Sequence, residues 1–298
     1  MESADRLLRS IDTLNDLHGI VSTMKVLSTV SIRQYEQAVK AQTDYYRTVQ
    51  LGLQVVLQDT QNAPATDHRE TKERQSAAIV FGSDYGLCGR FNEDIADFTV
   101  HHLKTASATP EKQQILVIGS RVAANLEHAG QAVEEELQLP GSAARITATV
   151  QKVLVKIEDW REQNDINKVS LFYNRHLSGG GYQPTRVELL PVNLQHFHPQ
   201  QKAQWPSRRL PTFTMDRKRL LSDLLRQYFF VSIFQACAES QASEHASRLA
   251  AMQSAEKNLD EKLGEFAIQF RRLRQEAITT ELLDVVSGFE AVMNETDK

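Results

Sequence analysis

The sequence predicts an α/β fold with two long α-helices: an antiparallel coiled coil of N- and C-terminal helices with a small α/β sheet domain inserted between them. Two observations predict this fold. Two proline-free stretches, residues 3–57 and 216–290, repeat apolar side chains at alternating spacings of three and four. Between them, short apolar runs alternate with helical spacings. The predicted order is a helix at 1–58, a linker at 59–76, the α/β domain at 77–195, a linker at 196–215 and a helix at 216–298.

The C-terminal helix has the stronger apolar seam. From Leu221 to Ala277, 14 of the 17 seam positions are apolar, and the polar exceptions are Gln235, His245 and Glu256. Polar residues in a seam often fix its register or mark where a coiled coil loosens. At 1.5 Å per residue the helix is roughly 110 Å long, which is too long to fold back inside a compact domain. It therefore needs a partner along its seam.

The N-terminal stretch is the predicted partner. Its seam runs from Leu7 to Val56 and is weaker, with polar residues at His18, Lys25, Ser28 and Gln42. Because a whole domain separates the two helices, antiparallel pairing is the simplest arrangement. The N-terminal helix spans only roughly 80 Å, so part of the C-terminal helix is expected to extend beyond it unpaired.

The central region alternates between strand and helix patterns. Apolar runs predict strands at residues 77–83, 114–119, 168–174 and 185–192, and a short one at 133–137. Helical spacing predicts helices at 92–104, 121–129 and 146–160. This alternation is typical of a largely parallel, Rossmann-like sheet.

Composition excludes several classes of protein. The net charge of −4 argues against a nucleic-acid partner. No apolar run is long enough to span a bilayer, and the N-terminus has no signal-peptide core, so we expect a soluble chain or one attached to a membrane through a partner. Cys88 and Cys237 lie far apart in apolar stretches, which indicates reduced structural thiols in a cytosolic protein rather than a disulfide framework.

Three stretches resemble the gamma subunit, the central stalk, of F-type ATP synthases. Residues 83–92 (SDYGLCGRFN) are similar to that family's T/S-D-R-G-L-C-G-x-x-N. Residues 242–258 (ASEHASRLAAMQSAEKN) are similar to its A-S-E-x-A-A-R-M-x-A-M-x-x-A-x-x-N. Residues 274–288 (RQEAITTELLDVVSG) are similar to its R-Q-A-x-I-T-x-E-x-x-E-I-V-x-G. The similarity follows the family order through essentially the whole chain.

This resemblance implies a rotor shaft that couples ion flow through a membrane ring to ATP synthesis or hydrolysis and is not itself catalytic. The implied partners are the alpha and beta subunits of the catalytic head, the epsilon subunit and the membrane c-ring, with no nucleic acid and membrane contact only through the complex. The implied location is peripheral, on the cytoplasmic face of the bacterial inner membrane. Neither a cofactor nor a catalytic or metal-binding residue is implied.

The sequence departs from the family pattern in its first helix. Basic residues that the family usually carries there are replaced at residues 20–24 (IVSTM) and 29–31 (TVS). We expect these changes to weaken charge complementarity to acidic loops of the catalytic subunits. Tyr85 also stands where the family has arginine. These departures suggest a divergent branch, such as the sodium-translocating, N-type complexes.

The resemblance implies subunit-interface roles for Arg274, Gln275, Thr279, Glu281, Met24, Arg248 and Glu244. The first three are expected to hydrogen-bond a loop of a catalytic subunit, although exposed Arg and Gln are usually just solvated. Glu244 and Arg248 could simply form an intrahelical pair worth a few tenths of a kcal/mol, and Met24 could equally be a packing residue. After Ala277 the apolar positions shift phase to Ile278, Leu282, Val285, Phe289 and Val292. That shift predicts a tip that leaves the coiled coil and sits in an apolar bearing made by other chains.

Two other classes of function remain open from the residues alone. One is a stand-alone coiled-coil adaptor with an α/β head, which would bind partners without any dependence on ATPase activity. The other is a nucleotide- or flavin-binding enzyme built on the α/β domain. The glycine-rich turn at residues 86–92 resembles a phosphate cradle, but it lacks the P-loop Lys-Ser/Thr and a full G-x-G-x-x-G spacing. Tight-turn glycines are therefore the preferred interpretation.

Overall fold

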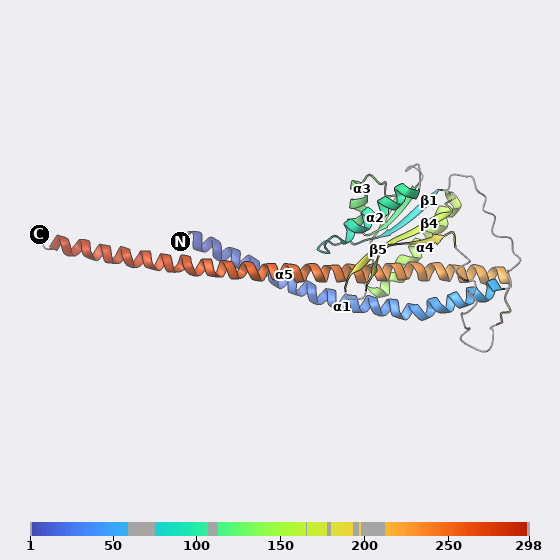
Figure 1. Ribbon diagram of the computed structural model, residues 1–298, viewed down its shortest axis with the longest axis horizontal. Helices are drawn as coiled ribbons and strands as arrows, with labels where there is room; N and C mark the ends of the chain where they lie inside the picture. The colour runs from blue at the N-terminus through green and yellow to red at the C-terminus, as the bar shows by residue number, and fades with distance from the viewer. Residues whose placement is uncertain are drawn as a thin grey trace. The chain divides into compact units, whose positions relative to one another are not determined.

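The computed structural model describes residues 2–58, 75–106, 113–164, 166–177, 180–192, 197 and 212–296, with the side chains of residues 2–4 and 288–296 left out. The predicted linkers at 59–76 and 196–215 lie largely outside these residues. The chain divides into a smaller unit of residues 1–27 and 249–298 and a larger unit of residues 28–248. Helices α1 (Glu2–Gln58) and α5 (Arg217–Thr296) contribute to both units (Figure 1).

A five-stranded sheet forms the centre of the larger unit. Its spatial order is β3-β2-β1-β4-β5. The strands are β1 (Ser76–Phe81), β2 (Gln113–Ile118), β3 (Glu135–Leu137), β4 (Lys168–His176) and β5 (Tyr182–Leu190). Every pairing is parallel except that of β5 with β4. The predicted largely parallel sheet is thus confirmed. Strand β5 is antiparallel because it follows β4 through a short hairpin, in which Leu177 N–H donates to Gly181 O at 2.9 Å.

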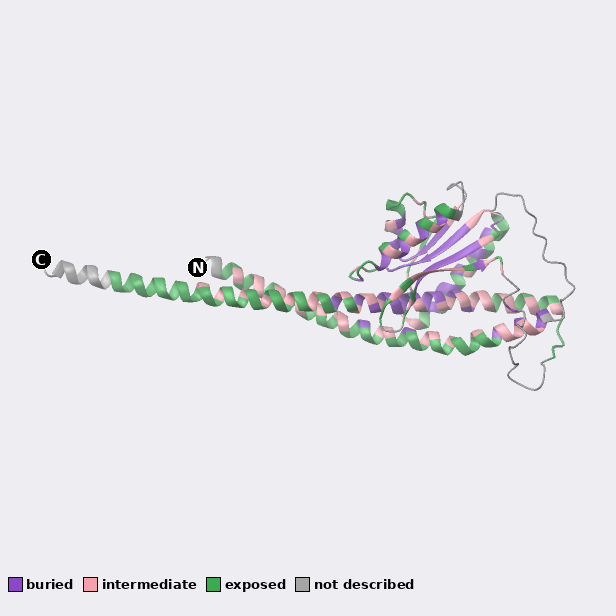
Figure 2. Ribbon diagram, viewed as in Figure 1, coloured by how far each residue is buried: buried purple, intermediate pink, exposed green. Residues whose placement is uncertain are grey.

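Helices cover both faces of the sheet. Apolar side chains of α2 (Phe91–Ala106) and α3 (Ser120–His128) pack on the face that carries Val80 and Val117. On the opposite face, which carries Ile79 and Leu116, α4 (Ile146–Gln163) and the part of α5 around Ile233 pack, joined by Tyr35 of α1. Alternate residues of β1 and β2 therefore belong to different cores, which is why both strands are buried and continuously apolar (Figure 2).

Within the larger unit, α1 and α5 pair in antiparallel order. Tyr35 stacks on His245 with ring centroids 5.7 Å apart, and Tyr46 stacks on Tyr228 at 6.1 Å. Near the end of α1, Leu53 is fully buried and belongs to a cluster that Leu221 and Leu224 of α5 also join. Residue numbers rise along α1 as they fall along α5, so the predicted antiparallel pairing is confirmed here.

In the smaller unit, α1 and α5 are again paired through predicted seam residues. His18 Nε2 lies 3.3 Å from Asp260 Oδ1, and Lys25 Nζ donates to Glu256 Oε2. Beyond Glu256, every partly buried side chain in the described part of α5 falls on a predicted seam position, and these are Leu259, Leu263, Phe266, Phe270 and Leu273.

The seam ends earlier in α5 than the sequence suggested. Ala277, predicted as the last seam residue, is exposed, as are all other side chains from Arg274 to Ser287 (Figure 2). Leu7 is the first seam residue of α1 with a described side chain. Counting outward along both helices from the Lys25–Glu256 pair places Leu7 level with the region of Leu273. The side chains beyond Leu273 therefore have no described seam residue of α1 opposite them.

Candidate functional site

The strand-end turn (residues 83–92) joins β1 to α2 and is fixed by its own side chains. Ser83 N–H donates to Asn92 Oδ1 at 2.9 Å, and Asn92 Nδ2 donates to Ser83 Oγ at 2.7 Å. Leu87 and Gly89 have φ angles of 62° and 57°. A left-handed conformation is natural for glycine but costs a leucine of order 1 kcal/mol or more. The surrounding contacts must hold this turn in place.

Asp84 ties the strand-end turn to the next parts of the sheet domain. Its carboxylate accepts one hydrogen bond from Ser120 N–H and another from Leu139 N–H, each at 3.0 Å. Gly119, beside Ser120, has φ 117°, and a Cβ there would lie 2.8 Å from Ser83 N, so the approach requires glycine. Because the carboxylate of Asp84 already occupies the N-terminus of α3, a phosphate there would be repelled. The geometry therefore disfavours the nucleotide-binding alternative at this turn.

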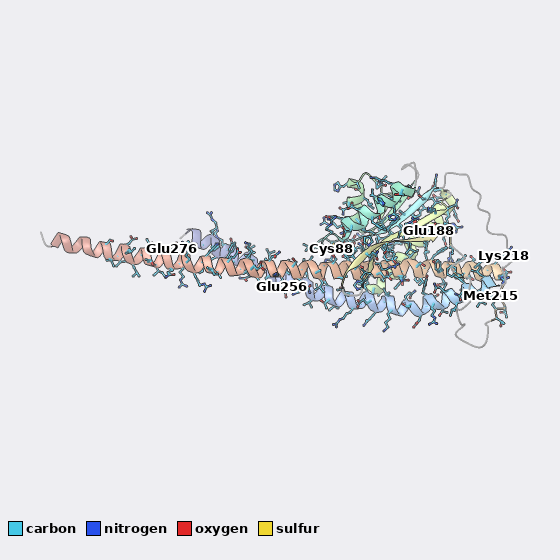
Figure 3. The ribbon with its side chains drawn as sticks, viewed as in Figure 1. Cys88, Glu188, Met215, Lys218, Glu256 and Glu276 are labelled. Atoms are coloured by element: carbon cyan, nitrogen blue, oxygen red, sulfur yellow. The ribbon has the colours of Figure 1, made fainter. Side chains whose placement is uncertain are left out.

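Side chains of α5 donate hydrogen bonds to backbone carbonyls of the strand-end turn. Ser247 Oγ donates to Cys88 O at 2.7 Å, and Arg248 Nη2 lies 3.3 Å from both Tyr85 O and Gly86 O. One turn earlier, Ser243 Oγ donates to the carbonyl of Asn174 in β4 at 2.9 Å. Cys88 is labelled beside α5 in Figure 3. Two of the three stretches that carried the family resemblance are thus in direct contact.

Arg248 and Glu244 are buried at this contact. Their side chains are 8% and 5% exposed, with Arg248 Nη2 2.7 Å from Glu244 Oε1. Burial raises the pKa of Glu244 to about 7, although the nearby Arg248 charge opposes the rise. His245, whose Nδ1 lies 3.4 Å from Arg248 Nη1, has its pKa lowered to about 4 by burial and by the arginine charge. The pair is therefore part of the chain's interior, and its predicted subunit-interface role stays a prediction.

Sequence reasoning missed the contact between α5 and the strand-end turn. The available signal was a run of short side chains in α5, and the structure buries these residues, which are Ala242, Ser243 and Ala246. Short side chains on one helix face allow another segment's backbone to approach closely. Serine in such a run supplies a donor for a carbonyl that burial would otherwise leave unpaired.

The other predicted interface residues lie in the smaller unit. Arg274, Gln275, Thr279 and Glu281 are exposed on α5, in the stretch where Glu276 is labelled in Figure 3. Thr279 Oγ1 donates back to Gln275 O at 2.9 Å, inside the helix.

Apolar side chains share this exposed stretch. Ile278, Leu282 and Val285 are 49%, 61% and 66% exposed, whereas the side chains of Phe289 and Val292 lie outside the described residues. Met24 is partly buried in α1 of the same unit. The structure thus leaves the tip residues accessible and tests none of their partners.

The larger unit also contains a cleft of about 590 Å³ between α4, β5 and the start of α5. Leu154, Leu190 and Phe229 contribute to its apolar lining, and the Glu158–Arg226 ion pair, at 2.9 Å, belongs to its wall. Among the described residues, no group of three or more His, Cys, Asp or Glu side chains is placed to hold a metal ion. No helix in the described part of the chain is long and apolar enough to cross a membrane.

The fold is similar to that of chains in two solved ATP synthase structures. A chain of the rotor structure of the Euglena gracilis mitochondrial ATP synthase has 16% sequence identity and a TM-score of 0.65, over 93% of this chain and 99% of that one. A chain of the Tetrahymena thermophila central stalk and c-ring structure has 18% identity and a TM-score of 0.58, over 79% and 99%.

A family model described as ATP synthase matches residues 3–292, and the chain belongs to that family. The ATP synthase gamma chain of Geotalea uraniireducens is 27% identical over 294 residues, covering 98% of this chain and 99% of the relative. That of Pelagibacter ubique is 26% identical over 296 residues, covering 98% and 100%.

Proposed function

We propose that this chain is the central rotor shaft of a rotary F-type ATP synthase, a subunit that couples ion flow to ATP synthesis or hydrolysis without catalysing either. The observation that carries the proposal is the end of α5, where every described side chain from Arg274 to Ser287 is exposed. A helix that offers apolar and hydrogen-bonding side chains together needs a surrounding protein surface. The match to the ATP synthase family through residue 292 includes this stretch.

The proposed partners follow from the same membership. They are the alpha and beta subunits around the paired helices and the tip, and the epsilon subunit and c-ring near the α/β domain. The shaft would comprise residues 1–58 and 216–298 and the head residues 77–195. The chain would be peripheral on the cytoplasmic face of the bacterial inner membrane. The sodium-translocating branch stays a prediction, because ion choice belongs to the membrane ring.

The proposal is tested by a gentle pull-down of the tagged full chain from its native cells. We expect two homologous nucleotide-binding chains to co-purify with it, together with ATPase activity. Recovery of partners without those chains and without ATPase activity would favour the adaptor alternative. Recovery of neither chain in an intact membrane extract would end the rotor proposal.

At the tip, replacing Arg274 by leucine together with Gln275 by alanine is expected to lower coupled ATP turnover of the assembled complex by about tenfold or more. The reason is that charge-assisted hydrogen bonds to a partner would be lost. The helix itself should remain, because both side chains are exposed and pack on nothing described. Turnover is measured in reconstituted vesicles, and helix content by circular dichroism of the isolated chain.

A matched control uses the same types of substitution within the paired part of α5. Gln269 and Arg271 are also exposed, so Gln269→Ala with Arg271→Leu changes charge and helix propensity equally. We expect this control to keep near-normal turnover. Equal loss in both double variants would show a general effect of surface charge and remove the specific role of Arg274 and Gln275.

A further inference from the structure

We propose that Glu244, Arg248 and His245 form a proton-sensitive clamp between α5 and the strand-end turn, which holds the turn more firmly when Glu244 is protonated than when it is ionised. The clamp lies within residues 28–248, so it belongs entirely to the larger unit. The clamp involves residues of this chain alone, whatever the chain's partners are.

The two carboxylate oxygens of Glu244 have different surroundings: one meets the Arg248 cation, and the other is buried without a donor in the described part of the chain. Glu244 Oε1 accepts from Arg248 Nη2 at 2.7 Å. Its second oxygen, Oε2, is buried without a hydrogen-bond partner among the described residues. An ionised carboxylate needs several donors, whereas a protonated one needs fewer and can itself donate. The unpartnered Oε2 therefore favours the protonated form, against the attraction of Arg248 for the ionised one.

The charges around Glu244 oppose each other. The Arg248 guanidinium lowers the pKa of Glu244, whereas repulsion by Asp84 raises it and adds to the larger effect of burial. The titratable and charged groups that face the site are Arg248, His245 and Cys237 on α5, Asp84 and Cys88 in the strand-end turn, Tyr35 on α1, and Arg121 on α3 near Gly86. Ionisation of Glu244 adds a second negative charge beside Asp84. Since Asp84 holds the strand-end turn to Ser120 and Leu139, that repulsion acts on the contacts that fix the turn.

The stability contributed by His245 changes with pH in the opposite direction to that contributed by Glu244. Glu244 has its pKa raised from 4.5 to about 7, so the stabilisation by its bound proton is complete below pH 4.5 and is lost as the pH rises to 7. His245 has its pKa lowered from 6.5 to about 4, so its neutral form stabilises the fold above pH 6.5, and this stability is lost as the pH falls to 4. Between about pH 4.5 and 6.5 the two effects oppose each other. In the unchanged chain the two contributions to the free energy of unfolding partly cancel in this range. A substitution at either residue removes one contribution, so the other becomes measurable.

The test is urea unfolding of the full chain, of Glu244→Gln and of His245→Gln between pH 4 and 8. For each variant, the unfolding equilibrium constant is divided by that of the unchanged chain at the same pH. Groups that titrate alike in both proteins then cancel. For Glu244→Gln we expect the ratio to fall by up to about tenfold per pH unit as the pH rises from 4.5 to 7. For His245→Gln we expect the ratio to fall by up to the same factor per unit as the pH decreases from 6.5 to 4. A Glu244→Gln ratio that does not change between pH 4.5 and 7 overturns the proposal.

Hydrogen exchange on the unchanged chain tests the clamp even if a variant does not fold. The reporting amides are those of Ser83, Phe91 and Arg121, which bond within or onto the strand-end turn. The control amides are those of Gly130 and Gln131, which bond within the end of α3.

After correction for intrinsic exchange, we expect protection of the reporting amides to fall severalfold between pH 6 and 8, while the control amides keep theirs. Constant protection of the reporting amides, or an equal fall at the control amides, would refute a clamp at this turn.

Discussion

Replacing Arg248 by alanine is expected to lower the free energy of unfolding by about 3–5 kcal/mol, the range for removing one partner of a buried ion pair. The substitution leaves Glu244 buried without its cation and takes the donor away from the carbonyls of Tyr85 and Gly86. The loss should be larger at pH 8 than at pH 5, because only the ionised form of Glu244 needs the arginine charge. Urea unfolding followed by circular dichroism measures both quantities.

An exposed ion pair in the same unit provides the control. Arg226 Nη2 lies 2.9 Å from Glu158 Oε1, but both side chains are more than half exposed. Exposed pairs contribute little because solvent screens them, so Arg226→Ala should leave the unfolding midpoint almost unchanged. Arg248→Lys keeps the charge without the planar fork of donors and should fall between the two. If Arg248→Ala is as mild as Arg226→Ala, the contact between α5 and the strand-end turn contributes little to stability.

The second large effect is expected at Trp160, the largest fully buried side chain of the core between α4, α5 and the sheet. Trp160→Ala should cost about 3–5 kcal/mol, because removing a buried aromatic leaves a cavity that the surroundings refill only in part. Its indole Nε1 also donates to Glu134 Oε2 at 2.8 Å. The measurement is again the free energy of unfolding in urea.

Trp160→Phe separates packing from hydrogen bonding. Phenylalanine keeps most of the buried ring but loses the donor, so the expected cost is about 1–2 kcal/mol. Glu134 would retain its ion pair with Lys156, whose Nζ lies 2.8 Å from Glu134 Oε1. A phenylalanine variant as unstable as the alanine variant would mean that the indole hydrogen bond, rather than the filled volume, dominates at this position.

The helical seams could be predicted from sequence because a period of three and four residues determines which side chains share a face. Even the polar exceptions follow the pattern, since Ser28 is buried and Gln42 is partly buried at their predicted places. Spacing alone does not determine which residue of one helix faces which residue of the other. The opposition of Lys25 and Glu256 is a property of the register, and only the structure supplied it.

The sheet was predictable in its strands but not in every pairing. Strand and helix patterns alternate as far as β4, and for those strands parallel order follows from the crossover helices. Between β4 and β5 no helical pattern intervenes, and the short glycine-containing connection at residues 177–181 indicates a hairpin. The start of β5 at Tyr182, three residues before the predicted start, belongs to that hairpin.

The candidate site was the least predictable part. Glu244 and Arg248 lie one helical turn apart among polar residues, and from sequence alone such a pair is expected to be exposed to solvent. Their burial depends on a turn about 160 residues away, whose backbone carbonyls have no signature in the sequence. Contacts from side chain to backbone across such a separation need the fold itself.

The Lys25–Glu256 pair in the smaller unit has a consequence for length. If either helix slipped by one heptad, Lys25 would face Leu249 or Leu263 and lose its ion pair with Glu256, and placing a partly buried charge against leucine is unfavourable. His18 would likewise lose Asp260. The pair therefore favours the alignment in which Leu273 is the last partly buried seam residue in the described part of α5. Two charges far from the exposed end of α5 thus help to set the length of that end.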